Sequence, residues 1–386
     1  MKIKWAMPLV LAVGVSAVAL SPAAYAGSDY QQFSEYSEKE VIQVSYHDWS
    51  YILKTTVFEG GMSDRSYAPP PTPGVGRKVY KGNSSPTRYE GNRLYFMAFM
   101  EDSNQKAIHR IRRELEAMPG AVPMAEWTKN QQLAYWLNLY NITVVEQIGK
   151  AYPETNIRSL LYGRKGILDK KLLTVAGEKL SLNDIHHKIL IPNWNDPLIM
   201  YGLFHGYVGS PNIRKEAYTA RNVYQMLREN AAEFINSNRG MVRDGDNLRV
   251  AELYQINKAL FPDWNKDLKA HLEAFATADY VPAIRRAGKV RAKTEDYYIA
   301  DLYQGVTHDD NPFAASSAVF AEMGNEMQQF TDSRGAPIVA SKFPPHVLDY
   351  VMKIRTKKSR KEGTVGVEEY VEPAPTASDT AATPEG

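Results

Sequence analysis

The stretch QLAYWLNLYNITVVEQIGK, Gln132 to Lys150, decides the fold. Its apolar residues recur at intervals of three and four, which is the period of one face of an α-helix. We predict a helix from about Met124 to Lys150 with one wide apolar stripe, and Pro153 lies just past its end. The stripe consists of Leu133, Trp136, Leu137, Tyr140, Val144, Val145 and Ile148.

Two asparagines interrupt this apolar helix. Asn138 and Asn141 lie three residues apart, so they share one face near the edge of the stripe. If that face is buried, the amides need partners, and we expect them to bind backbone groups of adjacent turns or loops. A bound ligand is the alternative partner.

The residues after this helix predict further helices separated by short strands. Ser181 and Asp184 form a capping-box pattern at the start of SLNDIHHKIL. Another helix is expected from near Thr219, with Gly240 as its C-cap. This irregular alternation favours an α+β fold, with helices, short strands and hairpins in one large domain. The expected strands are a hairpin at 172–182 turning at Gly177, a buried strand LIMYGLF at 198–204, and a hairpin at 241–254 turning around Asp244 and Gly245.

The first 26 residues have the pattern of a signal peptide. Lys2 and Lys4 precede an apolar run, and SPAAYA then ends in a motif that a signal peptidase accepts. We therefore expect cleavage after Ala26 and export to the periplasm or the medium. An uncleaved membrane anchor is the alternative, but the apolar run is short for a membrane span. No other segment has the length of a transmembrane helix.

The charge and cysteine content exclude several classes of function. Without Lys2 and Lys4 the basic residues number 44, which equals the 44 acidic residues, so no electrostatic attraction to nucleic acid is expected. The chain has no cysteine, which excludes thiol chemistry and thiolate metal sites. The charged segment IHRIRRELE, Ile108 to Glu116, is interpreted as a solvated helix face.

The segment MYGLFHGYVGSPNIR, Met200 to Arg214, is the first candidate for a functional site. His205 would stand at the end of a buried strand, where it could act as an acid, a base or a ligand. Ser210 could be a nucleophile or a hydrogen-bond donor, and Arg214 an anion clamp. In the alternative interpretation, Gly206 and Gly209 only permit a tight corner, which Pro211 stiffens.

The remaining histidines do not form a metal motif. His186 and His187 are adjacent on a predicted helix, so they should point about 100° apart and cannot form an i, i+4 metal pair. One of them could approach His205 in space. The sequence has no phosphate loop, no dinucleotide fingerprint and no HExxH motif, so we expect neither a cofactor nor a metal.

Three segments together resemble a known protein family. The order and spacing of QLAYWLNLYN, SLNDIHHKIL and the block from DPLIMYGLFHGYVGSPNIR to NAAEFINS are similar to those of domain of unknown function 547 (DUF547). The resemblance is firm from about Gln131 to Arg239. It is weaker back to HDWSYIL and forward to DYYIADLYQG.

The resemblance implies little about activity, because the family has no settled reaction. Many similar members carry cysteines in the turn, at the positions that His205 and Ser210 occupy here. This chain keeps Gly206, Pro211 and Arg214 but has neither thiol, so a thiol-based mechanism could not operate in it.

The resemblance and the composition together divide the chain into five parts. We expect a signal peptide at 1–26, an N-terminal helical region at 27–120, and a DUF547-like core at 121–305. A Pro/Gly-rich insertion should interrupt the N-terminal region at about 66–92, as a lid-like loop or a solvated segment. A helical extension at 306–356 and a disordered tail at 357–386 should follow.

Two functional hypotheses follow from these observations. The first is an exported, non-catalytic binding or scaffolding module of the cell envelope, with an envelope ligand or a protein as partner. Its candidate ligand-binding residues are Arg214, Tyr140, Gly206 and His187. The alternative is a hydrolase or acyl-transfer enzyme, with His205 as base, Ser210 as nucleophile, and Asn138 or Asn141 as orienting or oxyanion groups.

Overall fold

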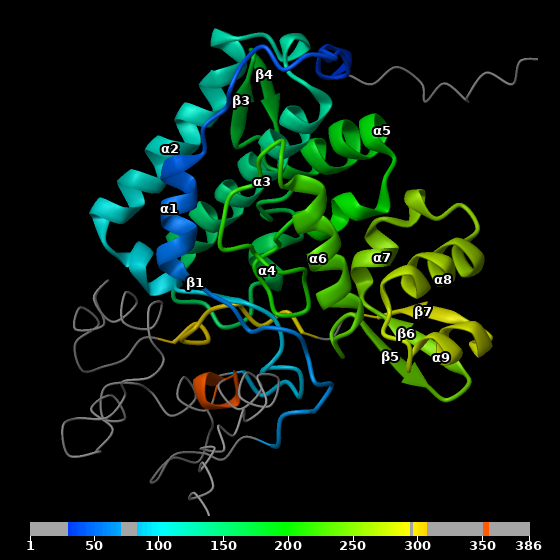
Figure 1. The fold of residues 1–386 in the computed structure, drawn as a ribbon. Helices are drawn as coiled ribbons and strands as arrows, with labels where there is room; N and C mark the ends of the chain where they lie inside the picture. The colour runs from blue at the N-terminus through cyan, green and yellow to red at the C-terminus, as the bar shows by residue number, and fades with distance from the viewer. Residues whose placement is uncertain (1–29, 71–82, 294–295, 307–349, 355–386) are drawn as a thin grey trace, which may run out of the picture.

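Helix α3 (Lys129–Ala151) runs through the middle of the computed structural model, which describes residues 30–70, 83–293, 296–306 and 350–354 (Figure 1). Of its 23 residues, 18 are buried. A helix that is buried on every side belongs at the centre of a large core. The predicted helix is thus confirmed. The prediction of a single apolar stripe is wrong, because the helix is buried on nearly all of its surface.

A capping box starts α3. The Thr128 side chain accepts a hydrogen bond from the backbone N–H of Gln131, and the Gln131 side chain accepts one from the backbone N–H of Thr128. The two side chains thereby satisfy backbone donors that the helix itself cannot. Residues Met124–Glu126, which were predicted to belong to this helix, form a separate 3-10 turn ahead of it.

Helices α1, α2, α4, α5 and α6 lie around α3, whereas α7, α8 and α9 lie to one side beside strands β5, β6 and β7 (Figure 1). Helix α2 packs along one side of it, and α6 contacts another part of it. No helix in the described part of the chain is long and apolar enough to cross a membrane. The remaining α-helices are α1 (His47–Thr56), α2 (Asp102–Ala121), α4 (Arg158–Leu161), α5 (Ile191–Trp194), α6 (Val223–Ile235), α7 (Glu252–Ile256), α8 (Trp264–Phe275) and α9 (Val281–Arg286).

The charged segment of α2 is only in part the solvated face that the sequence predicted: Arg110 and Glu114 are exposed, but other charges are buried. Arg112 is 7% exposed at its side chain and pairs with Glu146 of α3 and with Glu116. Lys150 Nζ lies 2.6 Å from a second oxygen of Glu146. Buried charges are tolerated when they are paired and hydrogen-bonded. The charges of α2 therefore join two helices, and part of this helix face is internal.

Two tight hairpins match the predicted turns. Strands β3 (Leu173–Val175) and β4 (Glu178–Leu180) pair antiparallel, and both residues of the loop, Ala176 and Gly177, have positive φ. Strands β5 (Met241–Asp244) and β6 (Asn247–Val250) are joined by Gly245 and Asp246. A third strand, β7 (Val290–Ala292), pairs parallel with β6, and β1 (Val57–Phe58) pairs antiparallel with β2 (Arg93–Leu94).

The apolar run LIMYGLF is buried, but it is not a strand. Residues Pro197–Gly202 form a 3-10 helix, which starts where the Asp196 side chain accepts a hydrogen bond from the backbone N–H of Leu198. A short apolar run has no period that separates a strand from a buried helix. Close packing also constrains Gly202, because a Cβ there would lie 2.7 Å from Leu227 and 2.8 Å from Leu137.

Helix α6 differs from its predicted bounds at both ends. It begins at Val223, after a hydrogen-bonded turn that starts at Thr219. It ends at Ile235 with Asn236 as C-cap, so the assignment of Gly240 as the cap was wrong. The need for glycine at 240 is steric, because a Cβ there would lie 1.9 Å from the carbonyl oxygen of Phe234.

The apolar side chains form two clusters within one domain. The larger cluster surrounds α3, and the smaller one lies among α6, α8 and the β5–β6–β7 sheet. The 3-10 helix separates them, since Ile199 belongs to the larger cluster while Met200 and Tyr201 belong to the smaller. The fold is therefore α+β in a single domain.

A short C-terminal segment docks on the N-terminal part of the chain. Residues 350–354 are helical, and the Tyr350 hydroxyl donates to the carbonyl oxygen of Gly91 at 2.7 Å. The Arg93 guanidinium stacks on the Tyr350 ring at 4.8 Å. Of the predicted terminal parts, the signal peptide, the tail and most of the helical extension lie outside the described residues. Within the predicted insertion, Asn83, Arg88, Glu90 and Asn92 are buried.

The position of Trp136 gives a first test of the core. This side chain is fully buried and packs edge-on against Phe33 and Tyr135 at centroid distances of 5.0 Å. Trp136→Ala should lower the free energy of unfolding by about 3–5 kcal/mol, because it opens a large cavity. Urea denaturation checks this value. Tyr51→Ala, at a residue that is 65% exposed, is the control and should change the free energy by less than about 0.5 kcal/mol.

Candidate functional site

The two asparagines of α3 hold loops in place. Asn141 Nδ2 donates to the carbonyl oxygen of Gly202 at 2.9 Å, and its Oδ1 accepts from the backbone N–H of Phe204 at 2.9 Å. Asn138 does the same with one residue, Tyr218, at 2.7 and 3.0 Å. Each amide thus replaces the backbone partner that a neighbouring strand would provide, which is how a structural anchor behaves.

His205 is buried among aromatic rings. It is 2% exposed, and the rings of Tyr140, Tyr207 and His186 lie 5.9, 6.0 and 6.4 Å from its centroid. Its Nδ1 has no hydrogen-bond partner among the described residues. Burial, with a smaller effect of His187, lowers the pKa of His205 to about 4. The imidazole is therefore neutral at pH 7.

Ser210 is also buried and is not paired with His205. Its hydroxyl donates to the carbonyl oxygen of Tyr207 at 2.7 Å. Within the described residues no hydrogen bond joins the two side chains, although a base that activates a nucleophile needs one. His205 and Ser210 thus lie buried in the turn from His205 to Pro211, which we call the corner.

Gly206 is required by the shape of the corner. Its φ is +85°, and a Cβ there would lie 2.1 Å from Ile148 Cδ1. Only glycine adopts this conformation without strain. A Cβ at Gly209 would lie 2.9 Å from the carbonyl oxygen of Asp296. Both glycines therefore let other chain segments approach closely.

The neighbouring histidines form a stack instead of diverging. The rings of His186 and His187 are 4.1 Å apart and inclined by 25°. The two residues follow each other in the π-helix Asp184–Leu190, and their side chains turn so that the rings face each other. His186 Nε2 lies 2.7 Å from Asn257 Oδ1. Across the described ranges, no group of three histidine or acidic side chains could hold a metal ion.

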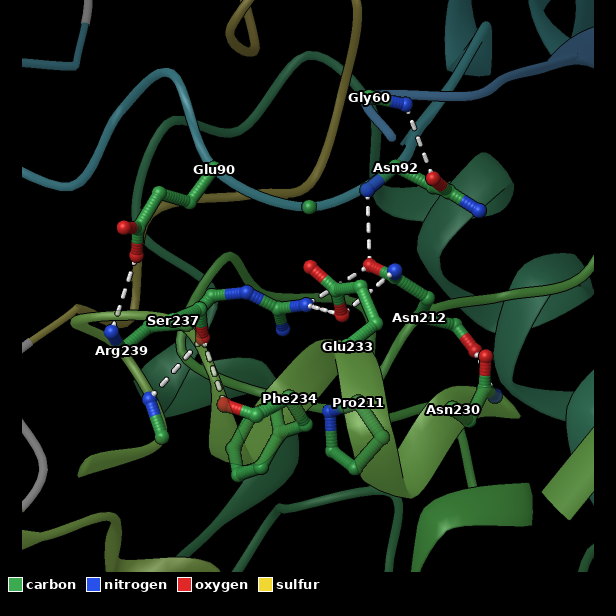
Figure 2. Close-up of polar contacts among 12 residues, drawn as sticks. Gly60, Glu90, Asn92, Pro211, Asn212, Asn230, Glu233, Phe234, Ser237 and Arg239 are labelled. Atoms are coloured by element: carbon green, nitrogen blue, oxygen red, sulfur yellow. Dashed lines mark hydrogen bonds and ion pairs between the residues drawn. The ribbon is translucent and has the colours of Figure 1, made fainter. Parts of the chain in front are cut away.

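A buried arginine, Arg239, holds the corner in place through hydrogen bonds (Figure 2). The Arg239 side chain is 1% exposed and pairs with Glu233 of α6. One guanidinium nitrogen donates to the carbonyl oxygen of Ser210, and another lies 3.0 Å from Asn212 Oδ1. These partners make the arginine a bridge between α6 and the turn.

The same cluster reaches the N-terminal part of the chain (Figure 2). Glu90 accepts the backbone N–H of Arg239 at 3.0 Å. Asn212 Oδ1 accepts the backbone N–H of Asn92 at 2.7 Å, and Asn92 Oδ1 accepts that of Gly60 at 2.9 Å. We call the set Gly60, Glu90, Asn92, Asn212, Glu233 and Arg239 the arginine cluster.

Within the described residues, Arg214 makes its polar contacts with α6 and not with His205 or Ser210. It pairs with Glu229 and donates to Asn230 Oδ1 at 3.2 Å, and both partners belong to α6. The candidate anion clamp is thus bound to an acid of its own chain. Of the sequence candidates, the structure brings together Tyr140, His205 and, through His186, His187. Tyr140, His186 and His205 are buried, whereas His187 is exposed.

A cavity of about 470 Å³ lies beside this corner, and the sequence analysis missed it. We call it the sheet pocket, because β5 and β6 form one of its walls. It is assembled from short segments far apart in the chain, so no motif marks it. Its lining residues are Tyr67, Ser84, Ser85, Pro86, Thr87, Gly209, Asn238, Arg239, Gly240, Val242, Arg249, Val250, Lys293, Asp296 and Tyr298.

A hydroxyl chain ends on a buried carboxylate in the sheet pocket. Thr87 Oγ1 donates to Asp296 Oδ2 at 2.8 Å, and Ser85 Oγ lies 2.8 Å from Thr87 Oγ1. The backbone N–H of Tyr298 donates to Asp296 Oδ1 at 3.2 Å. Burial raises the pKa of Asp296, and the hydroxyl donors partly offset this effect.

The sheet supplies the basic side of the pocket. Val242 and Arg249 are paired across β5 and β6, so their side chains share one face. Arg249 is paired with Arg291 of β7, and Lys293, two residues further on, lies on the same side as Arg291. Arg249 and Lys293 both line the pocket.

A second cavity of about 400 Å³ lies next to the N-terminus of α3. It has fewer hydroxyl groups and no buried carboxylate. Its lining residues are Glu40, Gln43, Val44, Tyr46, Gln131, Thr219, Ala220 and Arg221.

Comparison with known proteins identifies a family match in the central part of the chain. Residues 124–235 match the model of the family described as "Protein of unknown function, DUF547", which confirms the resemblance seen in the sequence. No curated protein and no solved structure matches the chain. The matched region contains α3, the corner and α6, whereas Gly209 is the only residue lining the sheet pocket that falls inside it.

The Asn141 anchor can be tested by stability. Asn141→Ala should lower the free energy of unfolding by about 2–5 kcal/mol, because it leaves a buried carbonyl and a buried N–H without partners. Asn130→Ala, at an exposed position of the same helix, is the matched control and should have little effect. Equal losses in the two variants would show that Asn141 is not an anchor.

The buried imidazole of His205 predicts acid sensitivity. Its pKa is about 4 in the folded state and about 6.5 in the unfolded state, so only the unfolded chain gains this proton between those values. Stability should therefore fall as the pH drops through this window, by about 1.4 kcal/mol per pH unit for this group.

His205→Phe keeps a ring but removes the titration. Between pH 7 and pH 5 the variant should lose about 2 kcal/mol less stability than the wild type, by urea denaturation at each pH. Between pH 8 and pH 7 the two curves should run parallel. A wild-type slope in the variant at acid pH would show that His205 does not contribute.

Proposed function

We propose that this protein is an exported, non-catalytic binding module of the cell envelope, and that the sheet pocket is its ligand site. Export is supported by the basic start, apolar run and Ala-Tyr-Ala end of residues 1–26. The observation that carries the binding function is the sheet pocket itself, a cavity of about 470 Å³ lined by hydroxyl, amide and charged groups. Ligand pockets generally have this size and a few converging polar groups.

The contacts of the candidate catalytic residues support a non-catalytic function. The Ser210 hydroxyl is bound to a backbone carbonyl, and the amides of Asn138 and Asn141 are bound to backbone groups on both sides. His205 is enclosed by rings. A hydrolase or acyl-transfer mechanism would need these groups to meet around a substrate, with the base next to the nucleophile.

The structure of the sheet pocket favours a polar ligand. Its walls are held by separate parts of the fold: Gly209 by the corner, Asp296 by its bonds to Thr87, and the basic side by the sheet. A pocket with fixed walls loses little entropy when it binds, so even a small ligand can bind specifically. Its lining also includes Tyr67, Pro86, Val242, Val250 and Tyr298, so the ligand should carry some apolar surface beside its polar groups.

A thermal-shift series on the full chain tests this proposal. The panel contains glycans, peptidoglycan fragments, lipids and divalent metals. A ligand at a hundred times its dissociation constant adds about 2.7 kcal/mol of stability, which raises the melting temperature measurably. Thr87→Val keeps the shape of the side chain but breaks the hydroxyl chain to Asp296, so it should reduce the shift for the true ligand.

Thr174→Val is the matched control, because Thr174 is an exposed residue of strand β3 outside the pocket. The control should respond to the panel as the wild type does. A flat panel, or a shift that Thr87→Val leaves intact, would contradict the assignment of the sheet pocket as the ligand site.

A further inference from the structure

We infer that the ligand of the sheet pocket is an uncharged saccharide, which packs a sugar ring on Tyr67 and hydrogen-bonds the hydroxyl pair of Ser84 and Tyr298. This inference rests on the proposed function and adds the chemical class of the ligand. The charged groups of the lining are already engaged within the chain, whereas several neutral groups and one aromatic ring are not.

Asp296, the acidic residue of the lining, is engaged by neutral donors of the chain. Its side chain is buried, and the hydroxyls of Thr87 and Ser85 both hydrogen-bond it. The backbone N–H of Tyr298 donates to its other oxygen at 3.2 Å. A cationic ligand would therefore compete with hydrogen bonds that the carboxylate already has.

The basic residues of the lining are engaged as well. The Arg239 guanidinium pairs with Glu233. Arg249 and Lys293 each interact with other groups of the chain. An anionic ligand would thus find no cation that is free to pair with it among the lining residues. Because a charge that enters a pocket loses its water and must be paired there, an uncharged ligand is favoured.

A pair of hydroxyl groups offers a neutral ligand a donor and acceptors. Ser84 Oγ and the Tyr298 hydroxyl lie 3.2 Å apart, and either of them can be the donor. In both cases one proton lies in this bond, and the other hydroxyl proton has no partner among the described residues. The pair therefore has one proton to donate to a ligand hydroxyl, whichever way the bond runs.

An amide oxygen of the lining offers a further acceptor. Asn238 Nδ2 donates to the carbonyl oxygen of Arg65 at 2.9 Å, which fixes the orientation of the amide. In the described part of the chain, no donor is bound to Asn238 Oδ1. A sugar hydroxyl both donates and accepts, so neighbouring hydroxyls of one ring can use this oxygen and the hydroxyl pair together.

Tyr67 supplies an aromatic surface to the pocket. It is 55% exposed, and within the described ranges its side chain has no ring contact or hydrogen bond. A tyrosine ring offers an apolar face together with a polar end, which suits a ring that carries both C–H and O–H groups. A sugar ring has this mixed surface. An inorganic ion has no C–H groups, and a lipid chain has no hydroxyls for the polar part of the lining.

Three disaccharides with one common frame test the charge of the ligand. Cellobiose is uncharged, its diamino analogue is a cation and its uronic acid analogue is an anion. Calorimetric titration of the full chain should show that cellobiose binds at least about 5-fold more tightly than either analogue, because a buried charge without a partner costs free energy.

Two variants then assign the contacts. Tyr67→Ala removes the ring and should weaken cellobiose binding by about 10-fold. Tyr298→Phe keeps a ring but removes the hydroxyl, and should weaken binding by about 5-fold. Tyr51→Ala is the matched control, since Tyr51 is an exposed tyrosine of α1 outside the pocket, and it should bind cellobiose like the wild type.

The unliganded variants show whether a loss of binding is a loss of folding. Tyr67 is exposed, so without ligand the melting temperature of Tyr67→Ala should equal that of the wild type. The same comparison for Tyr51→Ala gives the effect of removing an exposed tyrosine ring elsewhere.

Three outcomes would overturn the inference. The first is no binding of cellobiose, and the second is binding of a charged analogue as tight as that of cellobiose or tighter. The third is cellobiose binding that survives Tyr67→Ala and Tyr298→Phe together. If a ligand of another class, such as a peptide, then gives a thermal shift that depends on Thr87, the sheet pocket remains a binding site and only the saccharide assignment fails. If no ligand of any class depends on Thr87, the proposed function fails as well.

Discussion

The buried charge of Arg239 is the constraint on which the middle of the molecule depends. A guanidinium that is removed from water must be surrounded by acceptors, and here they come from α6, the corner and the loop after it. Once Glu233, Ser210 and Asn212 take these positions, the backbone around Arg239 is also placed, and Glu90 can bind it. The arginine cluster thus links the family-matched region to the N-terminal part of the chain. It also fixes one edge of the sheet pocket, because Arg239 and Gly209 both line that cavity.

The elements that the sequence predicted correctly are those with a local physical signal. The central helix has a period, and both hairpins have residues suited to positive φ in their loops, Gly177 and Gly245. The errors arose where the signal was ambiguous. LIMYGLF has no period, so its burial could be foreseen but its 3-10 conformation could not. The charges of α2 resembled a solvated face, and only the tertiary position of Glu146 makes Arg112 an internal residue.

The functional site was harder to predict from the sequence than the fold. The corner attracted notice because glycines, histidine and serine stand close together in the sequence. In the structure, Gly206 and Gly209 permit close approach of other segments, and the Ser210 hydroxyl is bound to a backbone carbonyl. The amides of Asn138 and Asn141 could be interpreted as anchors, since buried asparagines need partners and backbone groups are the nearest ones. The sheet pocket could not be inferred, because Ser85, Arg249 and Asp296 become neighbours only through the tertiary fold.

The bond between Thr87 and Asp296 joins residues that are 209 positions apart. During synthesis the first of them emerges long before the second, and the whole family-matched region lies between them. A growing chain therefore cannot form the sheet pocket until almost all of its described residues are available, and a ligand that bound there could not guide the early steps of folding. Binding at this pocket would instead report that the chain is folded as far as Asp296. A chain cut anywhere between these two residues, with the fragments separated, would lose the site whatever part of the core remained folded.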